Sequence, residues 1–106
     1  MPKYLFEASY TAEGAKGLLK DGGSGRRTAV EQLVQGLGSK VEAVCFSFGD
    51  VDASVIADVS AAVSAVAGSL AANTTGVMHV KPTVLSTSEE TDQAVQKTIK
   101  LRAPGG

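Results

Sequence analysis

The chain has 106 residues, of which 43% are hydrophobic and 20% charged, a composition typical of one globular domain rather than a disordered segment. Ten basic side chains against eleven acidic ones give a formal net charge of -1, which argues against a general nucleic-acid partner, because such a surface needs a concentrated excess of Lys and Arg. With no Trp and 5% aromatic residues, the core must consist mainly of Val, Ala and Leu, and the single cysteine, Cys45, rules out an internal disulfide and a multi-thiolate zinc site.

The sequence also predicts where the protein works. The first ten residues do not read as a signal peptide, because Glu7 interrupts the apolar stretch and no small-residue cleavage site follows it. The longest weakly polar run, residues 55–72, contains Asp58 and several serines and lacks the Leu, Ile and Phe content of a membrane span. We therefore expect a cytoplasmic protein with no membrane partner.

The first half of the chain predicts a strand followed by two helices. Residues 3–10 alternate as a strand does, and residues 11–20 form a weak helix because they contain two glycines. After the "DGGSG" break, the apolar residues of 25–38 repeat at helical spacing. Ser24 is the expected N-cap of this second helix and Gly38 its expected end.

The middle of the chain predicts a hairpin. Residues 40–48 and 51–59 have the composition of strands, and Gly49-Asp50 between them suits a two-residue type II′ loop. Such a loop places Phe48 directly opposite Val51 and sets the register of both strands.

The last third predicts a helix of small residues over 60–74, a strand over 76–85 and a short helix that begins at 88–90. Pro82 cannot donate a ladder hydrogen bond, which favours an edge position for its strand, and residues from about 100 to 106 form a loose tail. The main order is strand, helix, strand, strand, helix, strand. We therefore predict one α+β domain of ferredoxin-like βαββαβ topology, with two helices on one face of an antiparallel sheet and short extra helices.

Strand alternation assigns the side chains to two faces of this sheet. The face under the helices should carry Val44, Phe46, Phe48, Val51, Ala53, Val55 and Ala57. The open face should carry Val41, Ala43, Cys45, Ser47, Asp52, Ser54, Ile56 and Asp58, joined by Leu5, Glu7, Ser9, His79, Lys81 and Thr83 from the outer strands.

The open face mixes apolar and charged groups. Full exposure would leave its apolar area in water at about 25 cal/mol per Å², and full burial would strand its charges. A second copy of the sheet that encloses a partly wet cavity satisfies both demands. We therefore predict a homo-oligomer, a dimer or larger, with a small organic ligand in the cavity.

Three segments carry a family resemblance: "MPKYLFEASYTAEGAKGLLKDGGSGRR", "GLGSKVEAV" with "FGDVDASVIADV", and "VLSTSEE". The chain resembles the GYD domain family, small bacterial proteins without a settled activity. Gly49, Asp50 and Asp52 match the family's Gly-acidic-Tyr-Asp signature, and Val51 replaces the Tyr. The resemblance implies a layout similar to the dimeric α/β-barrel proteins, in which two ferredoxin-like sheets close face to face.

Several side chains are candidates for chemistry. His79, the only histidine, could act as an acid or base with Glu7 on an adjacent strand, and Asp52 is a weaker catalytic candidate. For Asp52 we favour a structural role, in which its carboxylate accepts backbone hydrogen bonds and tethers the hairpin. Arg26 and Arg27 could hold an anion near a helix N-terminus, or could lie over the sheet edge and pair with Glu31.

The candidate ligand-binding residues are Ser9, Asp52, Ser54, His79, Lys81, Arg26 and Arg27. We predict no metal site and no cofactor, because no ligand spacing or cofactor motif is present. Three functions remain open: a small-molecule-binding oligomer, which we favour; a cofactor-independent small monooxygenase or isomerase; and a structural assembly module.

Overall fold

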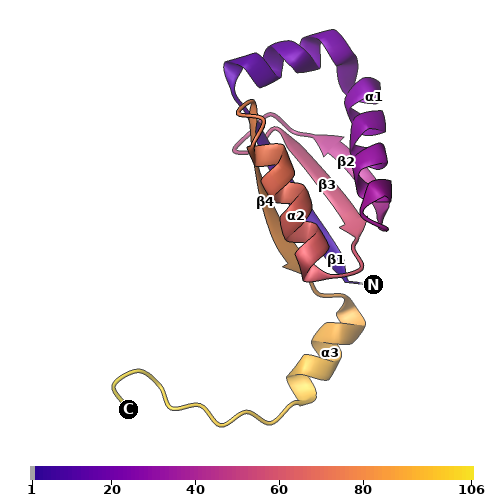
Figure 1. Cartoon of the computed structure of the whole chain (residues 1–106). Helices are drawn as coiled ribbons and strands as arrows, with labels where there is room; N and C mark the ends of the chain where they lie inside the picture. Colours follow the sequence, from indigo (N-terminus) through magenta and orange to yellow (C-terminus); the bar gives the residue numbers. More distant parts are fainter. Residues whose placement is uncertain (1) are drawn as a thin grey trace.

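The computed structural model describes residues 2–106 of the chain. Within this range the chain forms four strands and three helices (Figure 1). In chain order they are β1 (Lys3–Tyr10), α1 (Ala12–Gly36), β2 (Lys40–Phe46), β3 (Ala53–Asp58), α2 (Ala62–Asn73), β4 (Met78–Leu85) and α3 (Ser88–Gln96).

The four strands form one antiparallel sheet in the order β2-β3-β1-β4, so β1 pairs with β3 on one side and β4 on the other. The predicted α+β class with an antiparallel sheet is confirmed. Pro82 lies opposite Phe6 in the edge strand β4, the position expected for a residue without a backbone N–H.

Helices α1 and α2 cover one face of this sheet (Figure 1). The second half of α1 packs mainly against β2, and α2 packs mainly against β4. The small core between the layers contains Val34, Ala57, Val59 and Ala65, with half-buried apolar side chains around it. The sheet contributes Ala53, Val55 and Ala57 to this side, as the alternation predicts.

The β2–β3 register is the predicted one, with Phe46 opposite Ala53. The predicted type II′ loop at Gly49-Asp50 is wrong, however. Strand pairing ends at Phe46, and the left-handed φ of +54° belongs to Phe48 rather than to Gly49. The Gly49 N–H then donates to the Val51 carbonyl at 3.0 Å. Phe48 is consequently 61% exposed at the tip instead of lying under the helices, and its ring stacks on that of Phe46 at a centroid distance of 6.1 Å.

A β-bulge in β2 corrects a second expectation. Val41 lies opposite Ala57, but Ala43 lies opposite Ile56, so Glu42 is an extra residue in β2. One extra residue reverses the alternation on one side of the bulge. Val41 therefore packs against the core on the helix side, whereas the sequence predicted it on the open face.

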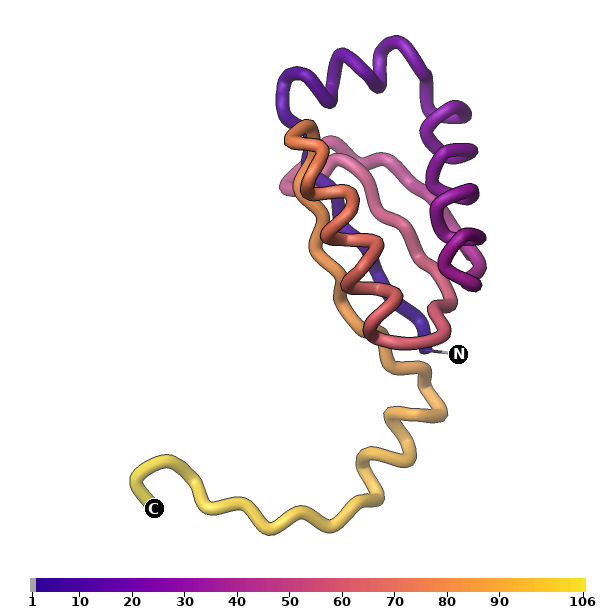
Figure 2. Tube along the Cα trace, in the orientation of Figure 1, coloured from indigo at the N-terminus to yellow at the C-terminus, as the bar shows by residue number. Residues whose placement is uncertain are grey.

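Helix α1 consists of two halves that meet at Gly22, where the backbone has φ +72° and ψ 170° (Figure 2). The break falls inside the predicted "DGGSG" segment. The Thr11 hydroxyl caps the first half by accepting a hydrogen bond from Gly14 N–H at 3.2 Å. Ser24 is not an N-cap, because the helix has already resumed when the chain reaches it.

The second half of α1 ends as predicted near Gly38. The helix stops at Gly36, Gly38 has φ +71°, and its N–H donates to the Gln35 carbonyl at 3.0 Å. Glycine adopts this left-handed conformation without the steric cost that a side chain brings.

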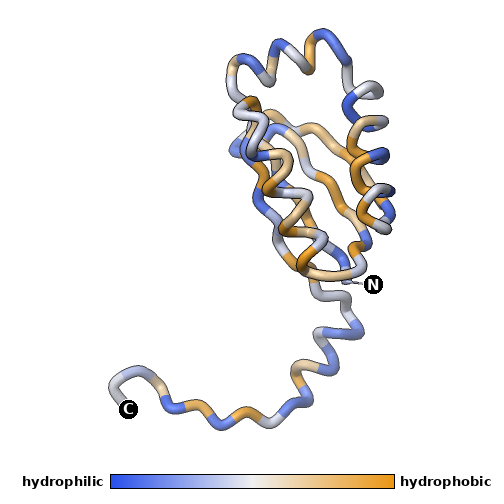
Figure 3. The backbone as a smooth tube through the Cα atoms, viewed as in Figure 1, coloured by the Kyte–Doolittle hydropathy of each residue, from blue (hydrophilic) through white to orange (hydrophobic). Residues whose placement is uncertain are grey.

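Beyond β4 the chain leaves the sheet, and α3 with residues 97–106 extends away from the rest (Figures 1 and 2). Thr87 and Glu90 form a reciprocal capping box at the start of α3. The pKa of Glu90 is lowered mainly by the hydrogen bond from the Thr87 backbone N–H and secondly by the hydrogen bond with the Thr87 side chain. Hydrophilic and hydrophobic residues alternate along the rest of this segment (Figure 3).

The start of α1 lies very close to the β4 end of the sheet, which generates a prediction. A Cβ on Gly14 would collide with the Val77 carbonyl oxygen, whereas a Cβ on Gly17 would meet no atom within 4 Å. We expect Gly14→Ala to lower the free energy of unfolding by about 1–3 kcal/mol, the usual cost of overpacking. The matched Gly17→Ala should raise it by about 0.5–1 kcal/mol through helix propensity. Urea unfolding followed by circular dichroism measures both, and equal effects would contradict the close approach.

Candidate functional site

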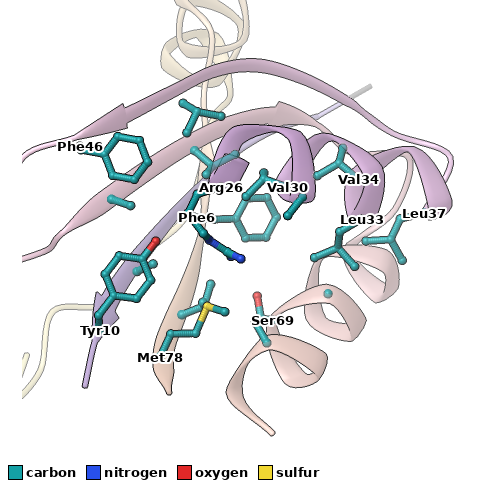
Figure 4. Close-up of a pocket in the computed structure, with 18 residues that line it drawn as sticks. Phe6, Tyr10, Arg26, Val30, Leu33, Val34, Leu37, Phe46, Ser69 and Met78 are labelled. Atoms are coloured by element: carbon teal, nitrogen blue, oxygen red, sulfur yellow. The ribbon is translucent and has the colours of Figure 1, made fainter. Parts of the chain in front are cut away.

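A pocket of about 120 Å³ lies between the sheet and the two helices that cover it (Figure 4). Its floor is the helix-covered face of the sheet. The floor side chains are apolar apart from the Tyr10 hydroxyl, and two of them are alanines: Phe6, Ala8, Tyr10, Val44, Phe46, Ala53, Val55, Met78 and Val80. Alanine side chains in the middle of the floor do not reach the helices, so the space above them stays open.

The walls of the pocket come from the two helices. The second half of α1 contributes a stripe at helical spacing, made of Ala29, Val30, Leu33, Val34 and Leu37. Gly68, Ser69 and Ala72 line the pocket from α2. The helices meet at one end, where Leu37 Cδ1 lies 3.0 Å from the point that a Cβ on Gly68 would occupy.

Two polar groups lie in this otherwise apolar wall without hydrogen-bond partners. Within residues 2–106, neither the Arg26 Nε nor the Ser69 hydroxyl has a partner, although both atoms are buried. Ser69 as a whole is 5% exposed. Figure 4 shows the Arg26 guanidinium and the Ser69 hydroxyl pointing into the pocket from α1 and α2. Buried polar atoms in folded proteins are nearly always paired, so within residues 2–106 these two unpaired atoms are exceptions that call for a partner.

The two arginines that the sequence pointed to have different surroundings. Arg27 follows the expected surface alternative, with its Nε 3.5 Å from the Glu31 carboxylate. Arg26 turns inward, its side chain is 23% exposed, and its Nη1 lies 4.0 Å from the Asp21 carboxylate. Adjacent residues on a helix point about 100° apart, which is why one of them reaches the pocket and the other does not.

Sequence reasoning missed Ser69. A usable signal exists in the spacing of Ala65, Ser69 and Ala72, which places a hydroxyl on the inner stripe of α2 among small apolar residues. The aromatic residues of the pocket are Phe6, Tyr10 and Phe46. The sequence placed Phe46 on the face under the helices but assigned none of the three to a site.

The remaining candidate residues lie on the open face, away from the pocket. Glu7 is opposite Ser54 on β3 and opposite Lys81 on β4, while Ser9 is opposite His79. Glu7 and His79 are thus diagonal neighbours across one ladder, close enough for long side chains to interact. His79 and Lys81 are exposed, and Glu7 is half-buried.

An ion cluster occupies one end of the open face. Lys3 Nζ donates to Glu42 Oε2 at 2.7 Å and to Asp58 Oδ1 at 3.0 Å. The hydrogen bond to Glu42, and after it the one to Asp58, raises the pKa of Lys3. The β-bulge makes the cluster possible, because it presents Glu42 on the same side as Lys3.

Asp52 has the structural role that the sequence favoured. Its carboxylate accepts a hydrogen bond from the Tyr10 backbone N–H at 2.7 Å, and its own N–H donates to the Ala8 carbonyl at 2.8 Å. Asp52 therefore ties the β2–β3 connection to the end of β1. Gly49 and Asp50, the other residues of the signature, are exposed at the tip.

Two findings bear on partners and metals. In the part of the chain that the structure describes, no helix combines the length and apolar character needed to cross a membrane. No group of three or more His, Cys, Asp or Glu side chains among residues 2–106 is arranged to hold a metal ion.

The comparison with protein families gives one match. The profile of the GYD domain matches residues 4–95, a range that begins in β1 and ends in α3. Searches of the curated proteins and of the solved structures gave no match.

The role of Asp52 can be tested against its neighbour in the same connection. We expect Asp52→Ala to lower the free energy of unfolding by about 1.5–3 kcal/mol, because it removes a hydrogen bond to a charged acceptor. Asp50→Ala should change it by less than about 0.5 kcal/mol, since Asp50 is exposed. Denaturant unfolding at neutral pH measures both free energies. A larger effect at Asp50 than at Asp52 would contradict the tethering role of Asp52.

Proposed function

The chain belongs to the GYD domain family, membership of which does not by itself indicate an activity, and we propose from the structure that this protein is an oligomeric domain that binds a small organic molecule. One observation carries the proposal: the apolar pocket between helices and sheet, with Arg26 and Ser69 directed into it. Ligand sites are typically apolar concavities with a few polar groups that orient the ligand.

The pocket favours a ligand over a purely structural role. Protein interiors are normally packed as densely as organic crystals, and a space bordered by apolar side chains loses dispersion contacts on its open side. About 120 Å³ is left by the side chains of this chain. An organic molecule in that space restores the contacts and removes its own apolar surface from water.

The open sheet face supports the oligomeric part of the proposal. Leu5 and Ile56 are paired in the ladder at the centre of this face, and both are half-buried in the single chain. The βαββαβ order and the strand order β2-β3-β1-β4 fit a ferredoxin-like domain. We therefore propose that two copies pair through these faces in the manner of a dimeric α/β barrel.

Ligand binding can be tested with benzyl alcohol, a neutral molecule of a size that suits the pocket. We expect it to shift the NMR signals of pocket residues and to raise the melting temperature. Ala72→Leu, which fills the pocket from α2, should abolish both effects, whereas Ala71→Leu on the exposed side of the same helix should preserve them. Unchanged binding by Ala72→Leu would show that the pocket is not the site.

Self-association can be tested by adding a charge to each candidate surface. We expect Ile56→Glu to convert the oligomer to a monomer in sedimentation velocity, because the carboxylate would be buried without a partner. Val66→Glu introduces the same charge on α2, where Val66 is 50% exposed, and should leave the oligomer intact. A monomeric wild-type chain, or dissociation by Val66→Glu alone, would contradict pairing through the open face.

A further inference from the structure

The unpartnered polar groups of the pocket indicate the chemical class of the ligand, which the volume of the pocket alone does not. Arg26 carries a permanent positive charge, because the guanidinium does not lose its proton in proteins. Its only nearby carboxylate is that of Asp21 within the described residues, and the 4.0 Å separation from Nη1 is too long for a hydrogen bond. The buried Nε donates to no atom of residues 2–106. The guanidinium therefore retains donors that point at the pocket.

Ser69 adds a second unused group on the opposite wall. Hydroxyl groups in or beside these helices can bond back to the preceding turn: Thr28 donates to the Ser24 carbonyl, and Thr74 donates to the Ala71 carbonyl. The Ser69 hydroxyl makes no such bond among residues 2–106, although only 5% of the Ser69 surface is exposed. It points into the same space as the guanidinium (Figure 4).

The chemistry that satisfies both groups is an anion with one charge. A carboxylate accepts two parallel hydrogen bonds from the Nε and Nη edge of an arginine and has lone pairs left for a hydroxyl. A phosphate dianion would bring a second charge among apolar side chains, with one cation to balance it. A neutral molecule would leave the Asp21 carboxylate, 4.0 Å from Nη1, as the one counter-charge near Arg26 among residues 2–106.

The rest of the pocket sets the shape of the molecule. Most of the remaining lining groups are apolar, with Phe6 and Met78 on the sheet side and Val30 on the helix side, and Tyr10 adds a phenol ring from β1. A cavity of about 150 Å³ with apolar walls takes up benzene, so the space of about 120 Å³ here suits a body of roughly one ring.

We infer that the ligand of this pocket is a monocarboxylate with a compact apolar body, of about the size of benzoate, whose carboxylate binds Arg26 and Ser69. This inference rests on the proposed binding function and adds the chemical class of the ligand. Arg26 supplies the charge and fixes the orientation, Ser69 supplies a hydrogen bond from the other wall, and the sheet floor contacts the apolar body.

The experiment compares benzoate with benzyl alcohol, which has the same ring and no charge. Titration calorimetry on the full chain should show benzoate binding about tenfold more tightly or better, the ratio expected when charge-assisted hydrogen bonds replace neutral ones. Arg26→Met keeps an apolar stem of similar length and should remove this preference while benzyl alcohol still binds. Ser69→Ala should weaken benzoate severalfold.

Matched variants distinguish benzoate binding in the pocket from benzoate binding at a charge on the surface. Arg27→Met removes an adjacent charge that is paired with Glu31, and it should leave the benzoate preference unchanged. Arg26→Gln serves as a second variant in case Arg26→Met does not fold, and the circular dichroism of each variant is checked first.

The outcomes distinguish this inference from the function on which it rests. Equal affinity for the two probes, with both blocked by Ala72→Leu, would overturn the carboxylate class and leave small-molecule binding intact. Loss of benzoate binding in Arg27→Met rather than Arg26→Met would assign the anion to the surface and overturn the inference. Binding of neither probe to the wild-type chain would overturn both proposals.

Discussion

The pocket exists because the sheet turns small side chains toward its helices. The antiparallel register places Ala8 opposite Ala53 on the helix side, and Val55 and Ala57 continue the same surface. Helices pack on a sheet at a distance set by their backbones and larger contacts, and alanine side chains do not fill that distance. A chain without Trp has few means to close the gap. The open space is therefore a direct result of which residues the ladder brings to one face.

Two layers of different character follow from this arrangement. On the helix side, mainly apolar walls surround the Arg26 guanidinium and the buried Ser69 hydroxyl, the two groups on which our proposal of a ligand site rests. On the other side, half-buried Leu5 and Ile56 lie near the ion cluster of Lys3. The two faces have separate roles in our proposal, one for a small molecule and one for a second copy, and the sheet between them links the two.

Local patterns predicted the order of elements, the edge position of Pro82 and the structural role of Asp52, because each depends on neighbouring residues. The Phe46–Ala53 register matches the prediction although the turn from which it was derived has a different conformation. The bulge at Glu42 was not predictable, since an extra residue in a ladder leaves no mark in the alternation of a single strand. Arg26 was a candidate for anion binding, but its inward direction depends on where helix α1 resumes after Gly22. Ser69 became a candidate only in the structure, where its buried hydroxyl has no hydrogen-bond partner among residues 2–106.

The break at Gly22 has a mechanical consequence. It divides α1 into a segment fastened to the turn before β4 by the contact of Gly14 with Val77, and a segment that carries Arg26. Gly22 itself is exposed, and a Cβ there would meet no atom within 4 Å, whereas a Cβ on the next residue, Gly23, would meet Phe46 Cε2 at 3.5 Å. The arginine-bearing segment packs mainly against β2, so the side chains that lie between this segment and the sheet bear directly on the distance that separates them.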